Sequence, residues 1–349
     1  MHNLLSLTIP VSRIATLPAS PRDSSKLMVI KHGIEDATID IFKNLSQHLP
    51  QGALVVFNDT RVVPARVMVE KPTGGKVVLL LLVNEFRPGD ASIKVLARER
   101  LTLGMKLKFP SWEEFQVVGQ DKNIFYLKPL FSVRKLPELL LRYGKTPIPP
   151  YLSRTVLSES KLRVKYQSIF ASRGNSAAAP TASLHFTKRV LRDLKKKKID
   201  KAFVTLDVGL GTFAPVGEQE LALGKLHSEF FEIPHSTILK IRKAKRDGRP
   251  IVAVGTTALR SLESAARLIL SGSSQTISQS TTLFVRDPYR FRVVDALVTN
   301  FHVPGSSLVY LVDAFLRYKR VSRSIEELYG EAVRKHFRFY SFGDAMLIS

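Results

Sequence analysis

The chain has 349 residues, enough for about two domains, and 44% of them are hydrophobic, which excludes an intrinsically disordered protein. It contains no cysteine, so iron–sulfur clusters and the radical chemistry that depends on them are excluded. Lys and Arg number 53 against 30 Asp and Glu, and the formal net charge of +23 favours a polyanionic partner such as a nucleic acid, although a generally basic proteome would give the same count.

The first fifty residues predict a strand and a helix. Residues 1–26 lack the basic start and the continuous apolar stretch of a signal peptide, so we expect a cytoplasmic protein. No apolar run approaches the roughly 20 residues that a membrane-spanning helix requires, and we expect no membrane partner. A strand is predicted over residues 27–30, and apolar residues at helical spacing predict a helix over residues 38–49.

The first candidate binding residues follow a buried strand. Residues 54–57 form a continuous apolar run, typical of a parallel strand covered on both faces, and Asn58, Asp59, Thr60 and Arg61 follow at once. Ligands of α/β proteins bind beyond the carboxyl ends of such strands. A carboxylate together with a guanidinium favours a binding site over the alternative, an Asx-turn that only hydrogen-bonds the local backbone.

Residues 66–146 have a different pattern from their flanks. Strand-like runs recur without intervening helices, which indicates a small antiparallel barrel or sandwich, and one helix is expected at the end of this region. The runs cover residues 77–83, 92–97, 106–109, 115–118 and 124–127, and the helix covers residues 136–143. We therefore predict the α/β class: a main α/β sheet domain formed by residues 1–65 and 147–349, with an inserted small antiparallel β-barrel domain over residues 66–146.

A loop of small residues and a glycine-rich strand end form the second candidate region. Residues 176–183 have mostly small side chains, which bury little apolar area and let a ligand approach the backbone closely, and His185 lies just beyond them. Residues 203–206 predict a buried strand. The chain then reaches Gly209 and Gly211, where a turn with positive φ is expected.

Two further strands bring polar residues to their ends or faces. Alternation along residues 228–233 puts Glu229 on the apolar face of a strand, and a carboxylate that is partly buried in this way is suited to proton transfer. Residues 250–254 predict another buried strand. Thr256 and Thr257 begin the helix that follows, and its N-terminal amides can bind an anion, the alternative being an ordinary threonine N-cap.

The C-terminal part alternates loops, strands and helices. We expect a loop over residues 271–281, strands over residues 282–285 and 293–298, and a helix over residues 306–315. His302 follows the second of these strands. Asp344 interrupts an aromatic and apolar segment, residues 337–348, that we expect to be packed in the core.

Long motifs spread over the chain resemble one family. They lie at residues 56–66, 73–76, 147–151, 176–187, 203–213, 226–229, 253–257, 299–304 and 342–347. Motifs of this length in one order are far more specific than a single short pattern, and they closely resemble the S-adenosylmethionine:tRNA ribosyltransferase-isomerases of queuosine biosynthesis. The resemblance also implies an α/β domain interrupted by a β domain.

The resemblance implies an enzyme, a non-radical transferase and isomerase. It would transfer the ribosyl part of S-adenosylmethionine onto 7-aminomethyl-7-deazaguanine at the wobble position of tRNA and isomerise it, giving epoxyqueuosine-tRNA, adenine and methionine. S-Adenosylmethionine is then a cosubstrate and no cofactor is bound permanently. The implied tRNA partners carry GUN anticodons, those for aspartate, asparagine, histidine and tyrosine, and we expect a monomer. The alternatives are a catalytically silent tRNA-binding relative and another S-adenosylmethionine-dependent RNA transferase.

The candidate site residues combine these motifs with positions at strand or helix ends. Those suited to proton transfer, and therefore predicted to be catalytic, are His185, His227, Glu229 and Asp59. The candidates for binding substrate or cosubstrate are Asn58, Arg61, Thr181, Gly209, Gly211, Thr212, Thr256, Thr257, Arg260, Glu263, His302 and Asp344. No group of histidines and carboxylates has the spacing of metal ligands, so we expect no metal.

Several residues depart from the family pattern, among them Lys26, which replaces an arginine, and three others. Ser183 stands where glycine is usual, Asp207 where histidine is usual, and Gly305 where lysine is usual. Asp207 matters most for the assignment of roles, because it brings a negative charge close to the predicted site.

Overall fold

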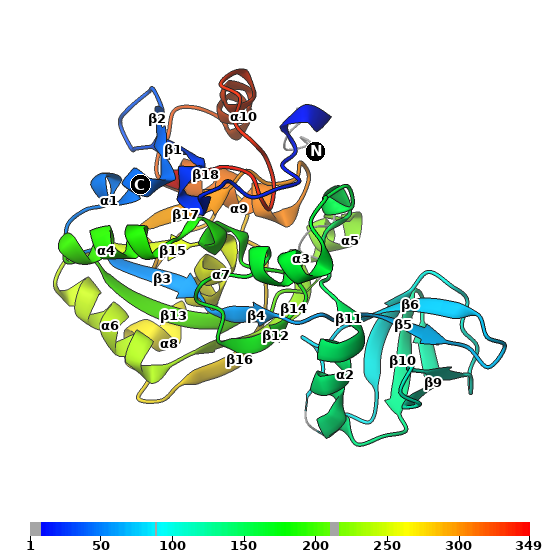
Figure 1. The fold of residues 1–349 in the computed structure, drawn as a ribbon. Helices are drawn as coiled ribbons and strands as arrows, with labels where there is room; N and C mark the ends of the chain where they lie inside the picture. The colour runs from blue at the N-terminus through cyan, green and yellow to red at the C-terminus, as the bar shows by residue number, and fades with distance from the viewer. Residues whose placement is uncertain (1–7, 88, 210–215) are drawn as a thin grey trace.

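The computed structural model describes residues 8–87, 89–209 and 216–349, and its largest feature is a mixed sheet (Figure 1). Nine strands of the described chain form this sheet in the order β16-β14-β13-β3-β15-β17-β18-β1-β2. They are β1 (Lys26–Ile30), β2 (Thr38–Ile41), β3 (Leu54–Asn58), β13 (Asp200–Leu206), β14 (Lys225–Ile233), β15 (Ile251–Val254), β16 (Ile277–Leu283), β17 (Ala296–Asn300) and β18 (Ala345–Ile348).

The centre of the main sheet is parallel and covered on both faces. β13, β3, β15 and β17 run in one direction, and every residue of β3, β15 and β17 is buried, as the continuous apolar runs predicted. On one face pack α1 (Leu45–His48) and α4 (Lys188–Lys196). On the other pack α6 (His235–Arg246), α7 (Thr256–Ser264), α8 (Ala266–Ser271), α9 (Ser307–Tyr318) and α10 (Ile325–Arg334).

A second antiparallel sheet closes into a barrel, because β5 pairs with β8 as well as with β6. Its strands in the described chain are β5 (Arg66–Glu70), β6 (Lys76–Leu81), β7 (Ile93–Ala97), β8 (Lys106–Lys108), β9 (Glu114–Asp121), β10 (Ile124–Pro129) and β11 (Gly144–Lys145). Alternate residues of β5 and β6 point inward and share a core with α2 (Leu136–Tyr143). The predicted fold class, a main α/β sheet domain with an inserted antiparallel β-barrel, is therefore confirmed.

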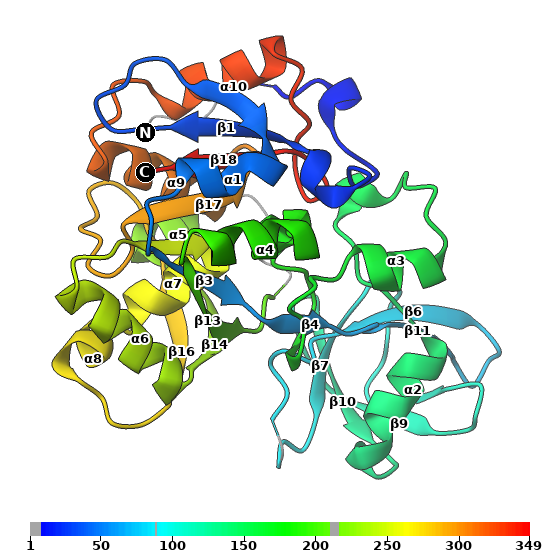
Figure 2. The ribbon, with the colours of Figure 1, turned by 60° about the vertical axis from the view of Figure 1, so that its left-hand side comes forward.

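The barrel is joined to the main sheet by short segments on one side (Figure 2). The chain enters it after β4 (Thr60–Val62), which pairs with β12 (Arg173–Ser176), and leaves it through β11. The remaining α-helices of the described residues are α3 (Glu159–Lys165) and α5 (Glu218–Leu223), and Thr181–His185 form a 3-10 helix. No helix of the described ranges combines the length and the apolar character needed to cross a membrane.

Two predicted elements are wrong. Residues 38–41 form edge strand β2 instead of the start of a helix, because they pair with β1, and only Leu45–His48 are α-helical. Residues 277–281 belong to strand β16, which pairs with β14, and not to a loop. Strand β17 also begins at Ala296, three residues later than predicted.

The topology brings polar segments together along one margin of the main sheet, which is formed by the ends of strands and not by an outermost strand. The four parallel strands all end there. β18 is antiparallel to β17, and β1 is parallel to β18, so the N-terminal ends of β18 and β1 lie at the same edge. The polar residues at these strand ends are Ser25, Asn58, Asp59, Asp207, Thr256, His302 and Asp344. We call this edge the polar edge, and it is where α/β folds bind their ligands.

Candidate active site

Asn58 ties three elements together at the end of β3. It is fully buried, and its amide nitrogen donates to the carbonyl of Leu206 at 3.0 Å and to Thr257 Oγ1 at 3.1 Å. Its amide oxygen accepts from the backbone N–H groups of Thr60 and Leu206. All its hydrogen-bonding capacity is used within the protein, so Asn58 aligns β3, β13 and α7.

Asp59 is held by hydroxyl groups. It is 8% exposed, and its two oxygens accept hydrogen bonds from Thr205 Oγ1 at 2.7 Å and Ser172 Oγ at 3.1 Å. The expected pairing with Arg61 is not formed, since Arg61 is exposed on β4 and makes no ion pair with the described residues. Asp59 therefore contributes a fixed, almost buried carboxylate to the polar edge.

Asp207 lies beside Asp59 with one oxygen fully occupied. Its Oδ1 accepts from Thr60 Oγ1 at 2.8 Å and from the backbone N–H of Asn175 at 2.9 Å. Burial raises the pKa of the Asp207 carboxyl above its ordinary value, and the charge of Asp59 acts in the same direction. Asp207 therefore combines a raised pKa with a second oxygen, Oδ2, that accepts no hydrogen bond from the described residues.

Glu229 forms a buried ion pair with Arg260. They are 6% and 4% exposed, and the guanidinium of Arg260 donates to Glu229 Oε2, while Glu229 Oε1 accepts from the backbone N–H of Gly209 at 3.0 Å. The alternation of β14 holds, because Glu229 shares its face with buried residues. The structure thus brings Glu229, Arg260 and Gly209 together, whereas the candidates Gly211 and Thr212 lie outside the described residues.

His185 is enclosed by the protein. It is 4% exposed and stacks on Phe42, with ring centroids 4.9 Å apart. Its Nδ1 is 2.8 Å from Ser25 Oγ, and its Nε2 is 3.2 Å from Asn300 Nδ2, which donates. Burial lowers the pKa of His185 to about 3, so the ring is neutral near pH 7. Both ring nitrogens are hydrogen-bonded within the protein, so His185 holds Ser25 and Asn300 in place at the polar edge.

The other two candidate histidines lie in opposite environments. His302 is buried with Nε2 2.7 Å from Thr299 Oγ1, and burial lowers its pKa to about 3. The side chain of His227 is 79% exposed, and its only described partner is Glu220, whose Oε1 is 3.6 Å away. The sequence predicted a catalytic role for His227 and a binding role for His302, but the structure puts His302 in the polar edge and His227 on the surface.

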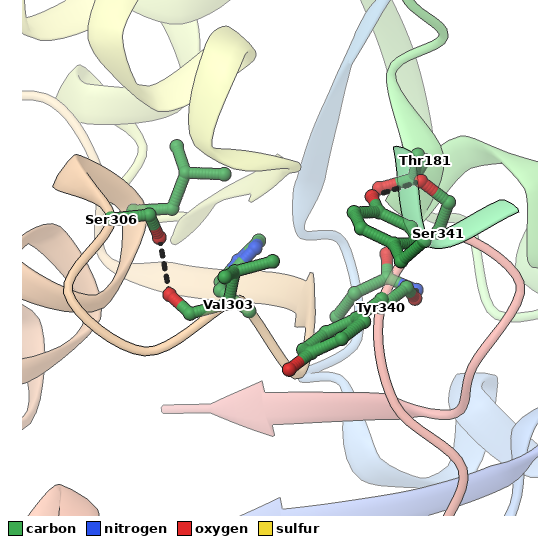
Figure 3. A pocket seen from close by; sticks show the side chains of 9 residues that line it. Thr181, Val303, Ser306, Tyr340 and Ser341 are labelled. Carbon is green, nitrogen blue, oxygen red and sulfur yellow. Dashed lines mark hydrogen bonds between the residues drawn. The ribbon is translucent and has the colours of Figure 1, made fainter. Parts of the chain in front are cut away.

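Two adjacent pockets open at the polar edge, and both are lined by Thr181, His302 and Leu308. The first also touches Asn300, Tyr340 and Ser341, and the second touches Thr256 and Thr257 at the start of α7. The empty space in and above them is about 300 Å³ and 340 Å³, solvent at the mouths included. Figure 3 shows the first pocket, with Val303 and Ser306 opposite Thr181, Tyr340 and Ser341. Four predicted binding residues thus line these adjacent pockets: Thr181 and His302 line both, and Thr256 and Thr257 line the second.

Two predicted binding residues are fully engaged in holding loops. Glu263 accepts hydrogen bonds from the three backbone N–H groups of residues 292–294. Asp344 accepts from the backbone N–H groups of Lys26 and Arg338 and from the guanidinium of Arg338. Both carboxylates are buried. Asp344 lies at the polar edge, whereas Glu263, near the C-terminal end of α7 and bonded to the residues that precede β17, lies at the opposite ends of the parallel strands.

Several residues of the polar edge were not singled out from the sequence. Asn300 and Tyr340 line the first pocket, and Asn84 and Arg87 of the barrel reach β13 and β14. Arg87 lies over the ring of Phe230, 4.5 Å from its centroid. Asn300 belongs to the family motif at residues 299–304, so its place in the sequence was a usable signal. Nothing in the sequence links residues of the barrel to the main sheet.

Metal chemistry receives no support from the side chains. Within the described ranges, no group of three or more histidines, aspartates and glutamates is close enough to hold a metal ion.

Comparisons with known proteins agree over nearly the whole chain. Residues 3–348 match the family model described as queuosine biosynthesis protein. The chain is 40% identical over 343 residues to the S-adenosylmethionine:tRNA ribosyltransferase-isomerase of Carboxydothermus hydrogenoformans, covering 97% of each. It is 41% identical over 344 residues to that of Rubrobacter xylanophilus, covering 99% of this chain and 96% of the relative. A crystal structure of S-adenosylmethionine tRNA ribosyltransferase from Thermotoga maritima is similar with a TM-score of 0.55 and 31% identity, over 98% of this chain and 99% of that one.

Proposed function

Because the chain belongs to the family of queuosine biosynthesis proteins, we propose that it is an S-adenosylmethionine:tRNA ribosyltransferase-isomerase. It transfers the ribosyl part of S-adenosylmethionine to 7-aminomethyl-7-deazaguanine at the wobble position of tRNA and isomerises it to epoxyqueuosine, releasing adenine and methionine. The observation that carries this proposal is identity of about 40% to enzymes of that name along 97% of the chain. The polar edge supplies the side chains that this chemistry needs.

The reaction needs groups that take up and return protons. A proton next to the sulfonium must be removed, the attacking amine must be neutral, and the departing adenine must gain a proton. A group serves such steps best when its pKa is close to the working pH. We assign these steps to Asp207 and Asp59, with Asp207 favoured by its raised pKa, because His185 and His302 are neutral over the whole physiological range.

The Glu229–Arg260 pair is assigned to binding. It lies midway along β14 and contacts Gly209, which follows Asp207 in the chain. A buried guanidinium nitrogen of Arg260, Nη2, has no partner among the described residues. Such a donor is suited to a carboxylate or a hydroxyl of the cosubstrate.

The tRNA partner is supported by charge. A net charge of +23 favours a polyanion, and a protein that neutralises several phosphates binds more weakly as salt rises. We propose tRNAs with GUN anticodons as the substrates and a monomer as the active form.

The test is release of adenine. The full chain is incubated with S-adenosylmethionine and tRNA carrying 7-aminomethyl-7-deazaguanine, and adenine and the tRNA product mass are measured. Adenine release and the mass gain of the epoxycyclopentanediol support the proposal, with guanine-34 tRNA as the inactive control. Tight tRNA binding without adenine release would indicate a catalytically silent relative, and a gain of one methyl group would indicate a different RNA transferase.

A further inference from the structure

Asn300 presents an unused hydrogen-bond acceptor to the first pocket. It is 1% exposed, and its amide nitrogen donates to His185 Nε2 and to the backbone carbonyl of Tyr340, both at 3.2 Å. The carbonyl of Tyr340 can only accept, so the nitrogen must face it and the amide orientation is fixed. Asn300 Oδ1 has no partner in the described chain. Buried polar atoms without a partner are rare in native proteins, and this one lines a pocket.

Tyr340 forms a wall of the same pocket in a strained conformation. Its φ is +71°, a region that an aromatic residue seldom occupies, and strain of this kind is concentrated at ligand-binding sites. Its ring lies 4.8 Å from that of Tyr151, centroid to centroid. In Figure 3 the ring of Tyr340 borders the pocket below Ser341. The backbone strain therefore presents an aromatic surface to whatever occupies the pocket.

The pocket is uncharged. Its lining contains hydroxyl, amide, aliphatic and aromatic side chains but no Asp, Glu, Lys or Arg, and the one histidine, His302, is neutral at pH 7. Neither a phosphate, a carboxylate nor a sulfonium would find a countercharge there. A flat, neutral heterocycle with an N–H donor matches an aromatic wall and an unpaired acceptor.

We propose that the first pocket binds an aminopurine-type base, with its exocyclic amine donating to Asn300 Oδ1 and its ring against Tyr340. The inference rests on the proposed function, which supplies two such bases: the adenine of S-adenosylmethionine and the 7-deazaguanine of the tRNA. Both carry an exocyclic amine, so the shared chemistry is the same.

Binding of free bases to the full chain tests the acceptor. Titration calorimetry is carried out with adenine and 7-aminomethyl-7-deazaguanine, and with their counterparts hypoxanthine and 7-aminomethyl-7-deazahypoxanthine, in which the ring carries no exocyclic amine. We expect one of the two amino bases to bind. The corresponding base without the exocyclic amine should bind at least about tenfold more weakly, because Asn300 Oδ1 then receives no hydrogen bond from that amine. The base that binds identifies the source. Equal affinities within both pairs, or no binding of either amino base, would overturn the proposal.

A matched pair of variants tests the aromatic wall. Tyr340→Asn keeps a residue type that tolerates positive φ but removes the ring, and it should weaken binding of the base by about tenfold. Trp112→Asn makes the same change at φ +74° on the barrel, where the side chain is 76% exposed, and should leave base binding unchanged. Similar base affinities for Tyr340→Asn and the parent chain, with thermal unfolding showing that both are folded, refute the pocket assignment.

These measurements separate the pocket from the activity, since base binding is measured without turnover. If tRNA-dependent adenine release occurs while Tyr340→Asn binds the base normally, the pocket assignment fails and the enzyme assignment stands. If the base binds through Asn300 and Tyr340 while no adenine is released, the pocket assignment stands and the enzyme assignment fails.

Discussion

Gly174 controls the position of the Asp207 carboxylate. It has φ +73°, and a Cβ built on it would lie 2.2 Å from Asp207 Oδ1 and 2.6 Å from Thr60 Oγ1. Only glycine adopts this backbone conformation without strain and leaves room for the carboxylate. The neighbouring amide of Asn175 can then donate to Asp207, so a glycine more than thirty positions from the aspartate decides its surroundings.

Gly174→Ala should therefore lower kcat/KM for adenine release by at least about tenfold and destabilise the fold by about 1–3 kcal/mol. The matched control is Gly33→Ala, because Gly33 has the same φ of +73° but nothing within 4 Å of the added Cβ. Urea unfolding and the adenine assay are measured for both variants. Equal effects of the two substitutions on kcat/KM would show that contact with Asp207 is unimportant.

The buried histidines make stability depend on pH. Burial lowers the pKa of His185 and His302 to about 3, whereas the unfolded chain takes up these protons below about 6.5. Between these pH values the unfolded state binds more protons than the folded state. The contribution of the neutral histidines to the free energy of unfolding is therefore fully present above pH 6.5, and it is lost as the pH is lowered toward 3. Each histidine contributes a slope of about 1 kcal/mol per pH unit in this range.

We expect the free energy of unfolding to fall between pH 6 and pH 5, and His185→Gln to reduce that slope by about 1 kcal/mol per pH unit. Asp207 and Glu263, whose pKa values burial raises, act in the opposite direction, so the comparison is made between variant and parent. His227→Gln, at an exposed site, should leave the slope unchanged. An unaltered slope in His185→Gln contradicts the neutral, buried state of that ring.

At the scale of elements, the Glu229–Arg260 pair fastens strand β14 to helix α7. Glu229 lies on the buried face of β14, and Arg260 lies in the first turns of α7. Both side chains are nearly inaccessible, with relative exposures of 6% and 5%. Removing one partner of such a pair leaves the other charge buried, which costs far more than the loss of a surface ion pair.

Arg260→Met is expected to destabilise the protein by about 3–5 kcal/mol. The control is Lys240→Met, which removes the ion pair with Asp200, whose side chains are 45% and 47% exposed, and should cost less than about 1 kcal/mol. Both are measured by urea unfolding. Comparable losses in the two variants would mean that the Glu229–Arg260 pair does not behave as a buried pair.

At the scale of the whole molecule, the barrel touches the polar edge of the main sheet. Arg87 covers Phe230 of β14, and the backbone N–H of Asp207 donates to the carbonyl of Phe230 at 3.1 Å. Asn84 lies so close to Gly209 that a Cβ there would be 3.3 Å from Asn84 Nδ2. The barrel therefore supports the strand ends that carry the candidate catalytic carboxylate.

Arg87→Ala should lower kcat/KM by about tenfold, because this contact orients the barrel relative to the main sheet. Thermal stability should change little, since a cation–π contact contributes only about 0.5–2 kcal/mol. Lys108→Ala removes a similar contact within the barrel, where Lys108 Nζ lies 4.1 Å from the Trp112 centroid, and should leave turnover unchanged. If both variants turn over like the parent, contact between barrel and sheet has no part in the reaction.

Much of the fold was already determined by the sequence. The continuous apolar runs at residues 54–57 and 251–254 lie in buried strands, because only a strand covered on both faces needs no polar side. The β-barrel followed from its strand spacing, and the order of motifs gave the family. The helix predicted over residues 38–49 failed, since short apolar spacing fits an edge strand as well and pairing with β1 decides between them.

Only the tertiary structure decided which candidate residues face a ligand. His185 and His227 are alike as motif residues, but the ring partners of His185, Ser25 and Asn300, are 160 and 115 positions away, and their contacts remove it from solvent. The unpaired oxygen of Asn300 and the contact of Arg87 with the main sheet also depend on distant segments. Burial, hydrogen-bond occupancy and pKa are set by neighbours in space, and local sequence does not specify those neighbours.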